Sequence, residues 1–429
     1  MKKFLKVNNT IFFLILIGSF FIGGYYNKAH AFEGFGENVT GGTGYNVVNV
    51  TNTNNSGSGS LRAALEGASN RIVRFTISGT INLSSALYIT GANITVDGFS
   101  APSPGITITS IGDAFIVSGN AYGGPDTTHG YNIAIQGLRL RNTGGDSFQI
   151  AYNAHDIVVD HVSINANGDG AVDVTEGAYN VTVSNSIVSN SIGNGPFLLA
   201  FDSDHVSYHH NIMYGNGDRN PIPSAGHVRN YSSGPARTGL LADTRYNLIW
   251  QYSIGSYVMS ENGAVGTHNV VGNLYRNNPI HNQSNNIGRS SYDNTTRAHA
   301  YVAGNVSVHD LRGTAYNYGG ASSGIPDSAF TVTSANMQGD QVSPFAAPII
   351  TGPSSLTQQS MIDLWTNVKN TAGVINYFPD DSTDAATRAA ITIPSVSVYQ
   401  EVWNLDAIIP VGGGFDTIPP ASPTGLVVV

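Results

Sequence analysis

The chain has 429 residues, of which 41% are hydrophobic and only 11% are charged, with 50 Gly and no Cys. This composition excludes a disordered chain, because charge density is low and enough apolar residues are present to form a large core. The net charge is −9, and without residues 1–31 it becomes −13, with 15 basic against 28 acidic residues. Nucleic acid is therefore not expected as a partner, since phosphate binding needs a basic surface.

Residues 1–31 have the pattern of a secretory signal peptide. Three lysines precede an apolar run from Ile11 to Phe21, and Ala29-His30-Ala31 supplies small residues for cleavage. Gly18 interrupts the run before it reaches the roughly 20 apolar residues that cross a bilayer. We expect a secreted, extracellular monomer with no membrane contact after cleavage. Without Cys it cannot use disulfides, so it needs an extended core and dense backbone hydrogen bonding.

The first predicted helix is short, at residues 60–66, with Ser60 as its N-cap. Short strands follow, and four of them recur at a fixed spacing. They begin at Asn132, Asp156, Asn180 and His205, which are 24, 24 and 25 residues apart. An antiparallel sandwich would show turns every 8 to 12 residues without this longer period. The spacing favours stacked parallel coils, whose exposed end the short helix would cover.

The same period is less regular on both sides of these four strands. Segments at Ile94, Ile106 and Phe115 indicate earlier coils, and Thr244 and Thr267, 23 residues apart, indicate that the period resumes after an insertion at about 220–240. In the regular coils, Asn follows the second strand at positions where a left-handed backbone is expected, at Asn142, Asn167, Asn190 and Asn216. We predict an all-β chain, a parallel β-helix with a short N-terminal capping helix.

Three aspartates are predicted to meet on one face of this solenoid. Asp146 and Asp169 are 23 residues apart and follow the same turn, and Asp173 is four residues beyond Asp169. Adjacent coils are separated by about 4.8 Å, so the three carboxylates should repel one another unless a cation lies between them. Oxygen ligands of this kind suit Ca²⁺. Solvated turn aspartates are the alternative interpretation.

Arg219 favours the metal-site interpretation. It follows Asp169 by 50 residues, or about two coils, and so should lie on the same face, where it could attract a substrate carboxylate. Alone, it would be read as a solvated surface charge. Of His209 and His210, at least one should point into the core as a hydrogen-bonding residue, and no His or Cys spacing indicates a zinc site.

A tail and a linker are predicted at the C-terminal end of the sequence. Residues 32–410 are predicted to form the β-helix domain with a C-terminal tail, which contains Lys369, the one lysine after residue 31. Residues 411–429 are Pro-rich and are similar to a linker running into the first strand of a fibronectin type III module.

Taken together, these motifs resemble those of the pectate lyase family, the first polysaccharide lyase family. The similar segments begin at Glu33-Gly-Phe-Gly-Glu-Asn-Val-Thr-Gly-Gly and Ser60-Leu-Arg-Ala-Ala-Leu. Ile157-Val-Val-Asp-His is similar to the family's Val-Trp-Ile-Asp-His segment, with Val158 in place of Trp. Asp169-Gly-Ala-Val-Asp matches its metal-binding coil, and Tyr208-His-His-Asn with Arg219-Asn-Pro matches the segment of its catalytic arginine. The resemblance extends over roughly residues 33 to 390.

The resemblance implies a right-handed parallel β-helix that cleaves α-1,4-linked galacturonan by β-elimination. Asp146, Asp169 and Asp173 would bind Ca²⁺, and Arg219 would remove the proton at C5 of the uronate. Two positions depart from the family pattern: Gly195 stands where a lysine is usual, and Ser224 where a second arginine is usual. Both usual residues would hold substrate carboxylates, so Arg229, Arg237 or Arg245 would have to replace them, and Arg229 and Arg245 are taken as the candidates.

Other functions stay open at this point. A galacturonan hydrolase on the same fold would need paired acids, for which Asp380 and Asp381 form the one adjacent acidic pair. A non-catalytic carbohydrate-binding or adhesive β-helix would explain the departures at Gly195 and Ser224. A pectin lyase acting on methylated substrate is less expected, because it would have no use for three stacked aspartates.

Overall fold

The computed structural model describes residues 32–119, 129–193, 195–225, 239–252, 255–260, 264–277, 287–291, 299–307, 349–354 and 357–393. The chain forms two units, Met1–Ala31 and Phe32–Val429, and all described residues belong to the second. The predicted signal peptide at 1–31 and the predicted linker at 411–429 lie outside the described ranges. None of the described helices is long and apolar enough to cross a membrane.

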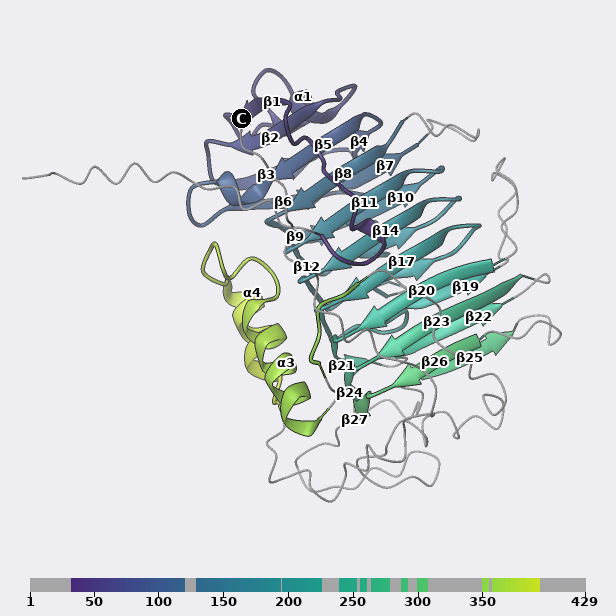
Figure 1. The fold of residues 1–429 in the computed structure, drawn as a ribbon. Coiled ribbons are helices and arrows are strands. Elements are labelled where there is room, and N and C mark those ends of the chain that lie inside the picture. Colours follow the sequence, from purple (N-terminus) through teal and green to yellow (C-terminus); the bar gives the residue numbers. More distant parts are fainter. Residues whose placement is uncertain are drawn as a thin grey trace, which may run out of the picture. The chain divides into compact units, whose positions relative to one another are not determined.

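In the described ranges the strands form three parallel sheets, named A, B and C here (Figure 1). In spatial order, the A sheet contains β1 (Asn46–Val50), β2 (Arg71–Phe75), β5 (Ala92–Asp97), β8 (Tyr131–Gln136), β11 (His155–Asp160), β14 (Tyr179–Ser184), β17 (Asp204–His209), β20 (Gly239–Arg245), β23 (Val265–Val271) and β26 (His299–Ala303). The B sheet contains β3 (Gly79–Leu83), β6 (Ile106–Ser110), β9 (Leu138–Thr143), β12 (Ser163–Asn165), β15 (Ile187–Ser189), β18 (Ile212–Tyr214), β21 (Leu248–Tyr252), β24 (Leu274–Asn277) and β27 (Val306–Ser307). The C sheet contains β4 (Leu87–Ile89), β7 (Phe115–Ser118), β10 (Phe148–Ala151), β13 (Val172–Val174), β16 (Leu198–Leu199), β19 (Ile222–Ala225), β22 (Ser256–Ser260) and β25 (Ile287–Ser291).

Each coil contributes one strand to each sheet, and the next coil pairs with it in parallel. In the A sheet, Ile157 pairs with Ile133 on one side and with Val181 on the other. These β-branched side chains are fully buried and stack in the interior, where they fit the pleated backbone. The predicted parallel β-helix and its period of about 24 residues are therefore confirmed.

The irregular coils differ from the sequence prediction in two places. The strands at Ile94, Ile106 and Phe115 belong to β5, β6 and β7, so they are three sides of one coil and not separate coils. The predicted match of Thr244 with Thr267 is wrong, because Thr244 pairs with Val270 in β23. Backbone pairing along the whole of β20 sets the register with β23. A threonine that recurs in the sequence does not indicate this register.

The prediction of a left-handed backbone at the asparagines after the second strand of each coil is confirmed at two of the four positions. Asn142 and Asn190 have φ angles of 53° and 52°, as expected. In the other two coils the residue before the predicted Asn takes this conformation, at Ala166 (φ 58°) and Gly215 (φ 65°). Asn167 is buried instead, and its Oδ1 accepts a hydrogen bond from Ser191 Oγ at 2.8 Å.

A row of buried asparagines crosses the later coils. Asn211, Asn247, Asn273 and Asn305 are at most 1% exposed. Asn211 Nδ2 donates to Asn247 Oδ1 at 3.1 Å, Asn247 Nδ2 to Asn273 Oδ1 at 2.9 Å, and Asn273 Nδ2 to Asn305 Oδ1 at 2.9 Å. Each amide thus meets the hydrogen-bonding needs of its neighbour, which lets polar side chains be buried at the bend between the A and B sheets.

The predicted N-terminal helix is α1 (Leu61–Leu65), and Ser60 Oγ accepts a hydrogen bond from Ala63 N at 3.2 Å. Leu61 and Leu65 are fully buried, and the helix packs against β1 and β4. These strands are the first of the A and C sheets, so the expected role as a cap is confirmed.

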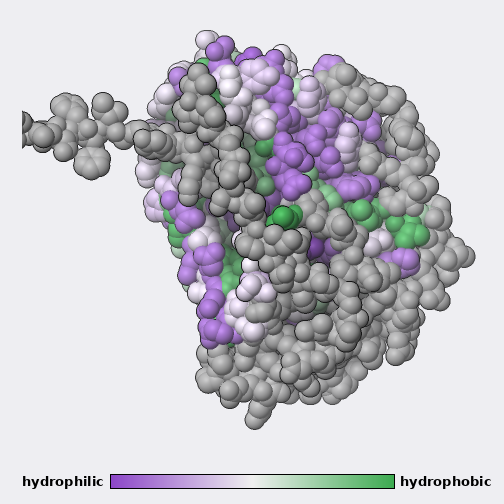
Figure 2. Space-filling model, viewed as in Figure 1, coloured by the Kyte–Doolittle hydropathy of each residue, from purple (hydrophilic) through white to green (hydrophobic). Residues whose placement is uncertain are grey.

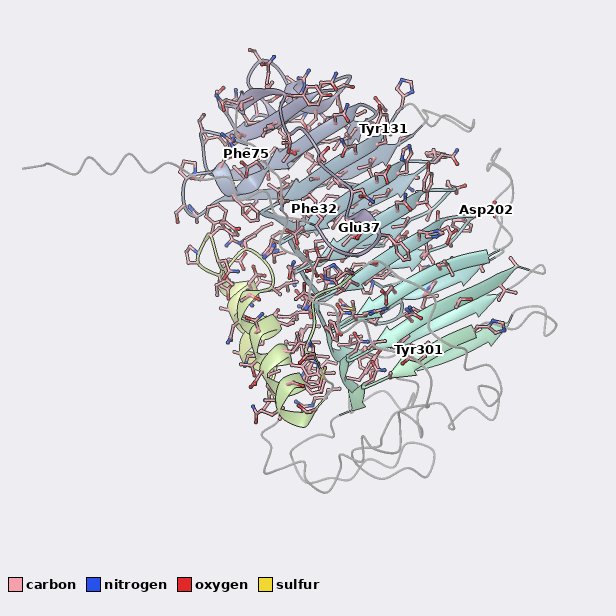
Figure 3. The ribbon with its side chains drawn as sticks, in the orientation of Figure 1. Phe32, Glu37, Phe75, Tyr131, Asp202 and Tyr301 are labelled. Carbon is pink, nitrogen blue, oxygen red and sulfur yellow. The ribbon has the colours of Figure 1, made fainter. Side chains whose placement is uncertain are left out.

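Before this helix, residues 33–42 run across the outer face of the A sheet as a strap, with the 3₁₀-helix η1 (Gly34–Gly36) within it. Backbone N–H groups of Phe35, Gly36 and Gly42 donate to side-chain oxygens of Ser207 in β17, Thr182 in β14 and Thr95 in β5, at 2.8 to 3.1 Å. Figure 3 shows Phe32 and Glu37 of this region over the strands. The strap ties together coils that are far apart in sequence.

The predicted C-terminal tail contains two packed helices, α3 (Gln358–Thr371) and α4 (Ser382–Ala390), beside the solenoid (Figure 1). Trp365 of α3 is fully buried and its Nε1 donates to Gly272 O at 2.8 Å. Arg141 of β9 binds Asp381 at 2.9 Å and the fully buried Asp384 at 3.0 Å.

A second 3₁₀-helix, η2 (Gly98–Ser100), follows β5. On the face seen in Figure 2, most of the described surface is hydrophilic, as expected once these helices cover the apolar B sheet.

We predict that Asn247→Ala lowers the free energy of unfolding by about 2 to 4 kcal/mol, because it leaves several buried partners unpaired at once. Asn247 bonds Asn211, Asn273 and the carbonyl of Tyr208. Chemical denaturation measures the change, and Asn54→Ala, at an exposed asparagine, is the control with an expected change below about 0.5 kcal/mol. Equal effects at the two positions would contradict the role of the row.

Candidate active site at the turn into the C sheet

The candidate site lies on the stacked turns that lead from the B sheet into the C sheet. The pairing of β7, β10, β13, β16 and β19 gives their coils a common register, with an isolated bridge between Gly170 and Gly195. In this register Asp113, Asp146, Gly170, Gly195 and Arg219 occupy corresponding positions in five successive coils. The two glycines are therefore flanked by Asp113 and Asp146 on the N-terminal side of the stack and by Arg219 on the C-terminal side.

Asp146 is 7% exposed and is held by backbone contacts on both sides. Its Oδ1 accepts a hydrogen bond from Gly170 N at 2.7 Å, and its own N–H donates to Asp113 Oδ1 at 2.8 Å. Burial raises the pKa of Asp146 to about 7, and the carboxylates of Asp169 and Asp113 add to the increase, against the hydrogen bond from Gly170. Its Oδ2 has no hydrogen bond in the described part of the protein, so it can serve as a ligand.

Asp173 of β13 is the second buried acid, at 6% exposed. Its Oδ1 accepts from Leu198 N at 3.2 Å, and its Oδ2 lies 3.7 Å from Arg219 Nη1. Burial and then the neighbouring Asp146 raise its pKa well above the ordinary value, although Arg219 opposes this. Arg219 itself has a left-handed backbone, with φ 57°, and its N–H donates to Asp218 Oδ1 at 2.7 Å.

The structure thus brings Asp146, Asp173 and Arg219 together, with Asp169 at the rim. Asp169 is exposed, and its charge acts on both buried acids. In the described ranges, a group of three His, Asp or Glu residues whose ligand atoms all lie within 4.8 Å occurs at Glu33, His209 and His210, and not at the aspartates. The aspartates are more open than a closed metal site.

This set of residues fits a hard divalent cation. Burial raises the pKa of both carboxyl groups, and neighbouring carboxylates, Asp169 and Asp113 for Asp146 and Asp146 for Asp173, raise them further. A cation between the carboxylates would favour their charged forms. The donors are all oxygens, and the open arrangement leaves room for water and substrate oxygens, as Ca²⁺ prefers.

Asp113 is a residue of this site that the sequence reasoning missed. It is half-buried and lies two residues before the start of β7. It is 33 residues before Asp146 and not 24, since its coil contains a longer connection, so a search at the regular period passes over it. The sequence does contain a signal: Asp113 lies two residues before Phe115, as Asp146 lies two residues before Phe148. The two phenylalanines pair in β7 and β10, so the two aspartates correspond.

Gly195 has a structural reason to be glycine. Its φ is +115°, and a Cβ there would lie 1.9 Å from Asp218 O and 3.1 Å from Arg219 Cβ. A lysine at this position would therefore displace the segment that presents Arg219. Ser224, at the other departure from the family pattern, is 5% exposed within β19.

The proposed replacements for these cations do not lie beside the aspartates among the described residues. Arg245 is at the end of β20 in the A sheet. Its Nε lies 2.7 Å from Asp243 Oδ1, so the guanidinium group forms an ion pair with that carboxylate. Arg229 and Arg237 lie outside the described residues. Lys369 is in α3, where its Nζ donates to Ile391 O at 2.7 Å.

The prediction that at least one of His209 and His210 points into the core is wrong, since both lie beside Glu33 of the strap. Tyr208 is the residue that points into the core, whereas Ser207 and His209 alternate to the outer face of the A sheet, where the strap covers them. His209 is 2% exposed, so it is buried between the sheet and the strap and not within the solenoid.

We predict that Gly195→Ala lowers the free energy of unfolding by about 2 to 4 kcal/mol, because the added Cβ meets backbone and the φ angle is strained. Gly217→Ala is the matched control, since a Cβ there meets nothing within 4 Å. Thermal or chemical unfolding of the two variants measures the difference. A Gly195→Ala protein as stable as the control would show that the turn yields easily.

A second prediction concerns pH. Because the pKa of Asp146 is raised to about 7 in the folded protein, the folded state binds more protons than the unfolded state between about pH 4 and pH 7. In chelator, stability should therefore fall as pH rises through this window, by up to about 4 kcal/mol from this group. Asp146→Asn should remove that part of the fall. The measurement is unfolding free energy against pH for both proteins, and parallel curves would count against a raised pKa.

No model of a known protein family matches the chain. Over 285 residues it is 27% identical to the probable pectate lyase C of Aspergillus fumigatus, covering 65% of this chain and 57% of that protein, and over 299 residues it is 28% identical to the one of Aspergillus terreus, covering 67% and 64%. The matched part thus spans little more than half the length of the first relative.

Among solved structures, the thermostable pectate lyase PL 47 is similar with a TM-score of 0.56 at 15% identity, covering 80% of this chain and 97% of that one. At this identity the likeness supports the fold alone. It supports the parallel β-helix, and the sequence relatives bear out the resemblance inferred from the motifs: the chain is a pectate lyase-like β-helix protein by distant similarity to proteins described as probable pectate lyase C.

Proposed function

We propose that the protein is a secreted, Ca²⁺-dependent pectate lyase that cleaves α-1,4-linked galacturonan by β-elimination. The observation that carries the proposal is the approach of Arg219 Nη1 to Asp173 Oδ2, at 3.7 Å, beside the buried carboxylate of Asp146. A cation next to a partly open set of carboxylates suits a polymer whose every sugar has a carboxylate of its own. The pectate lyase-like relatives support the same substrate class.

Asp146, Asp169 and Asp173 are the proposed Ca²⁺ ligands. When bound, the ion would stabilise the negative charge that develops on the uronate carboxylate as the C5 proton leaves. Asp146 would offer Oδ2, since Gly170 N holds its Oδ1, and this contact fixes the carboxylate with respect to the next coil. Asp113, bonded to the Asp146 backbone, would position that ligand.

Arg219 is the proposed base at C5. It is 22% exposed in its side chain, so it can reach both the carboxylates and a bound polymer. Removal of the C5 proton and departure of the C4 oxygen leave a C4–C5 double bond in the product.

A bound polymer has further carboxylates beside that of the reacting uronate, and each would be stabilised by a positively charged side chain. In the described part of the site, Arg219 is the one such side chain. Arg229 remains the proposed second group, in the segment before β20. The export of the chain through residues 1–31 and its action as a monomer outside the cell are part of the same proposal.

Two alternatives are weighed by the described contacts. A hydrolase would use paired acids, but Asp381 caps α4 and pairs with Arg141, and Asp380 pairs with Arg388 at 2.7 Å, so neither is available to activate water. A non-catalytic carbohydrate-binding β-helix is favoured by the absence of side-chain space at Gly195 and by the small Ser224.

The test is the absorbance of unsaturated product from polygalacturonate, with Ca²⁺ or with chelator, from neutral to strongly alkaline pH. Product should form with Ca²⁺ and stop with chelator, and Arg219→Ala should lower the rate by about 100-fold or more while staying folded. Arg71→Ala, in β2 of the A sheet, is the matched arginine control and should retain the rate. Binding of polygalacturonate without product at any pH would favour the non-catalytic alternative.

A further inference from the structure

A second group of potential ligands lies between the strap and the outer face of the A sheet. His209 at the end of β17, His210 after it and Glu33 at the start of the strap place one ligand atom each within 4.8 Å of one another. Glu33 is separated from His209 by 176 positions in sequence, so no local spacing could indicate this group.

The Nδ1 atoms of His209 and His210 share a hydrogen bond, which an ion bound between the two rings would replace. Their Nδ1 atoms are 2.9 Å apart, and their ring planes are nearly perpendicular, at 87°. Zinc–nitrogen bonds of about 2.0 to 2.1 Å in a tetrahedron would place two nitrogens about 3.3 Å apart, so a small opening of the pair accommodates the ion.

The protein alone does not use the full bonding capacity of His209. The residue is 2% exposed, and its Nε2 has no hydrogen bond in the described part of the chain. A buried ring nitrogen without a hydrogen-bond partner is available to bind a metal ion.

Glu33 is held in place as a ligand would be. Its Oε2 accepts a hydrogen bond from Thr351 N at 2.8 Å, and its Oε1 accepts one from Thr351 Oγ1. Each carboxylate oxygen keeps a further acceptor site, and outer hydrogen bonds of this kind orient metal-binding carboxylates. Gly34 N also donates to Ile349 O at 3.2 Å, so the strap meets the segment before α3 here.

We infer that Glu33, His209 and His210 form a zinc site, separate from the carboxylates at the C sheet, which fastens the strap and the 349–354 segment onto the A sheet. Two nitrogens and one carboxylate oxygen, with water as a fourth ligand, suit Zn²⁺ and not Ca²⁺, which prefers six to eight oxygens. Because the three ligands come from distant parts of the chain, Zn²⁺ would bind the folded state and raise its stability.

The test is zinc binding by the full chain after treatment with a chelator, measured by calorimetry and by metal analysis, in excess Ca²⁺ to fill the carboxylate site. One Zn²⁺ per chain is expected, with a higher melting temperature in Zn²⁺. Glu33→Gln and His210→Gln should each weaken binding at least about tenfold. His155→Gln, at a ring stacked between Tyr131 and Tyr179, is the matched control and should bind zinc normally.

Co²⁺ provides a readout of geometry, since a four-coordinate site with nitrogen ligands gives visible absorption that the two variants should lose. No zinc bound in excess Ca²⁺, or equal affinity in His210→Gln and the unaltered chain, would overturn the inference. Circular dichroism establishes that each variant is folded, and Glu33→Gln keeps the test valid if His210→Gln is not. Lyase activity plays no part in these measurements, so the two proposals fail or succeed independently.

Discussion

Parallel backbone pairing between successive coils is the constraint on which the other features depend. Once β11 pairs with β8 and β14 in register, every turn must also repeat at the strand spacing of about 4.8 Å. The turns into the C sheet can approach so closely only with glycine: a Cβ at Gly168 would lie 2.2 Å from Gly144 O. The asparagine row answers the same constraint at the other bend, because each amide there bonds the amide of the next coil.

The same stacking forces the candidate site into an unfavourable electrostatic state. Asp146 and Asp173 are buried and near each other because their coils are adjacent, and burial raises the pKa of both. Arg219 relieves part of the repulsion from two coils away, and it reaches Asp173 because Gly195 presents no side chain between them. In the proposed function, a bound cation would offset this cost and stabilise the folded state.

How much the sequence could reveal follows from whether a feature is periodic. The strands at Asn132, Asp156, Asn180 and His205 were predicted because they repeat, and the meeting of Asp146, Asp173 and Arg219 follows from the same arithmetic. Asp113 was missed since its coil is longer, and Thr244 was misaligned because a repeated residue type does not reveal register. The pairing of Glu33 with His209 depends on the strap crossing the A sheet, which no periodicity encodes.

The outer faces of the A and C sheets thus have different tasks. On the A sheet, Ser207 and Thr182 receive backbone hydrogen bonds from the strap, so outward polar side chains act as anchors in a chain without Cys. At the turn into the C sheet, outward carboxylates have few internal partners and remain able to bind ligands. Fastening the strap therefore need not involve the turn residues, and a metal under the strap would change the stability of the coils while leaving Asp146, Asp173 and Arg219 in their places.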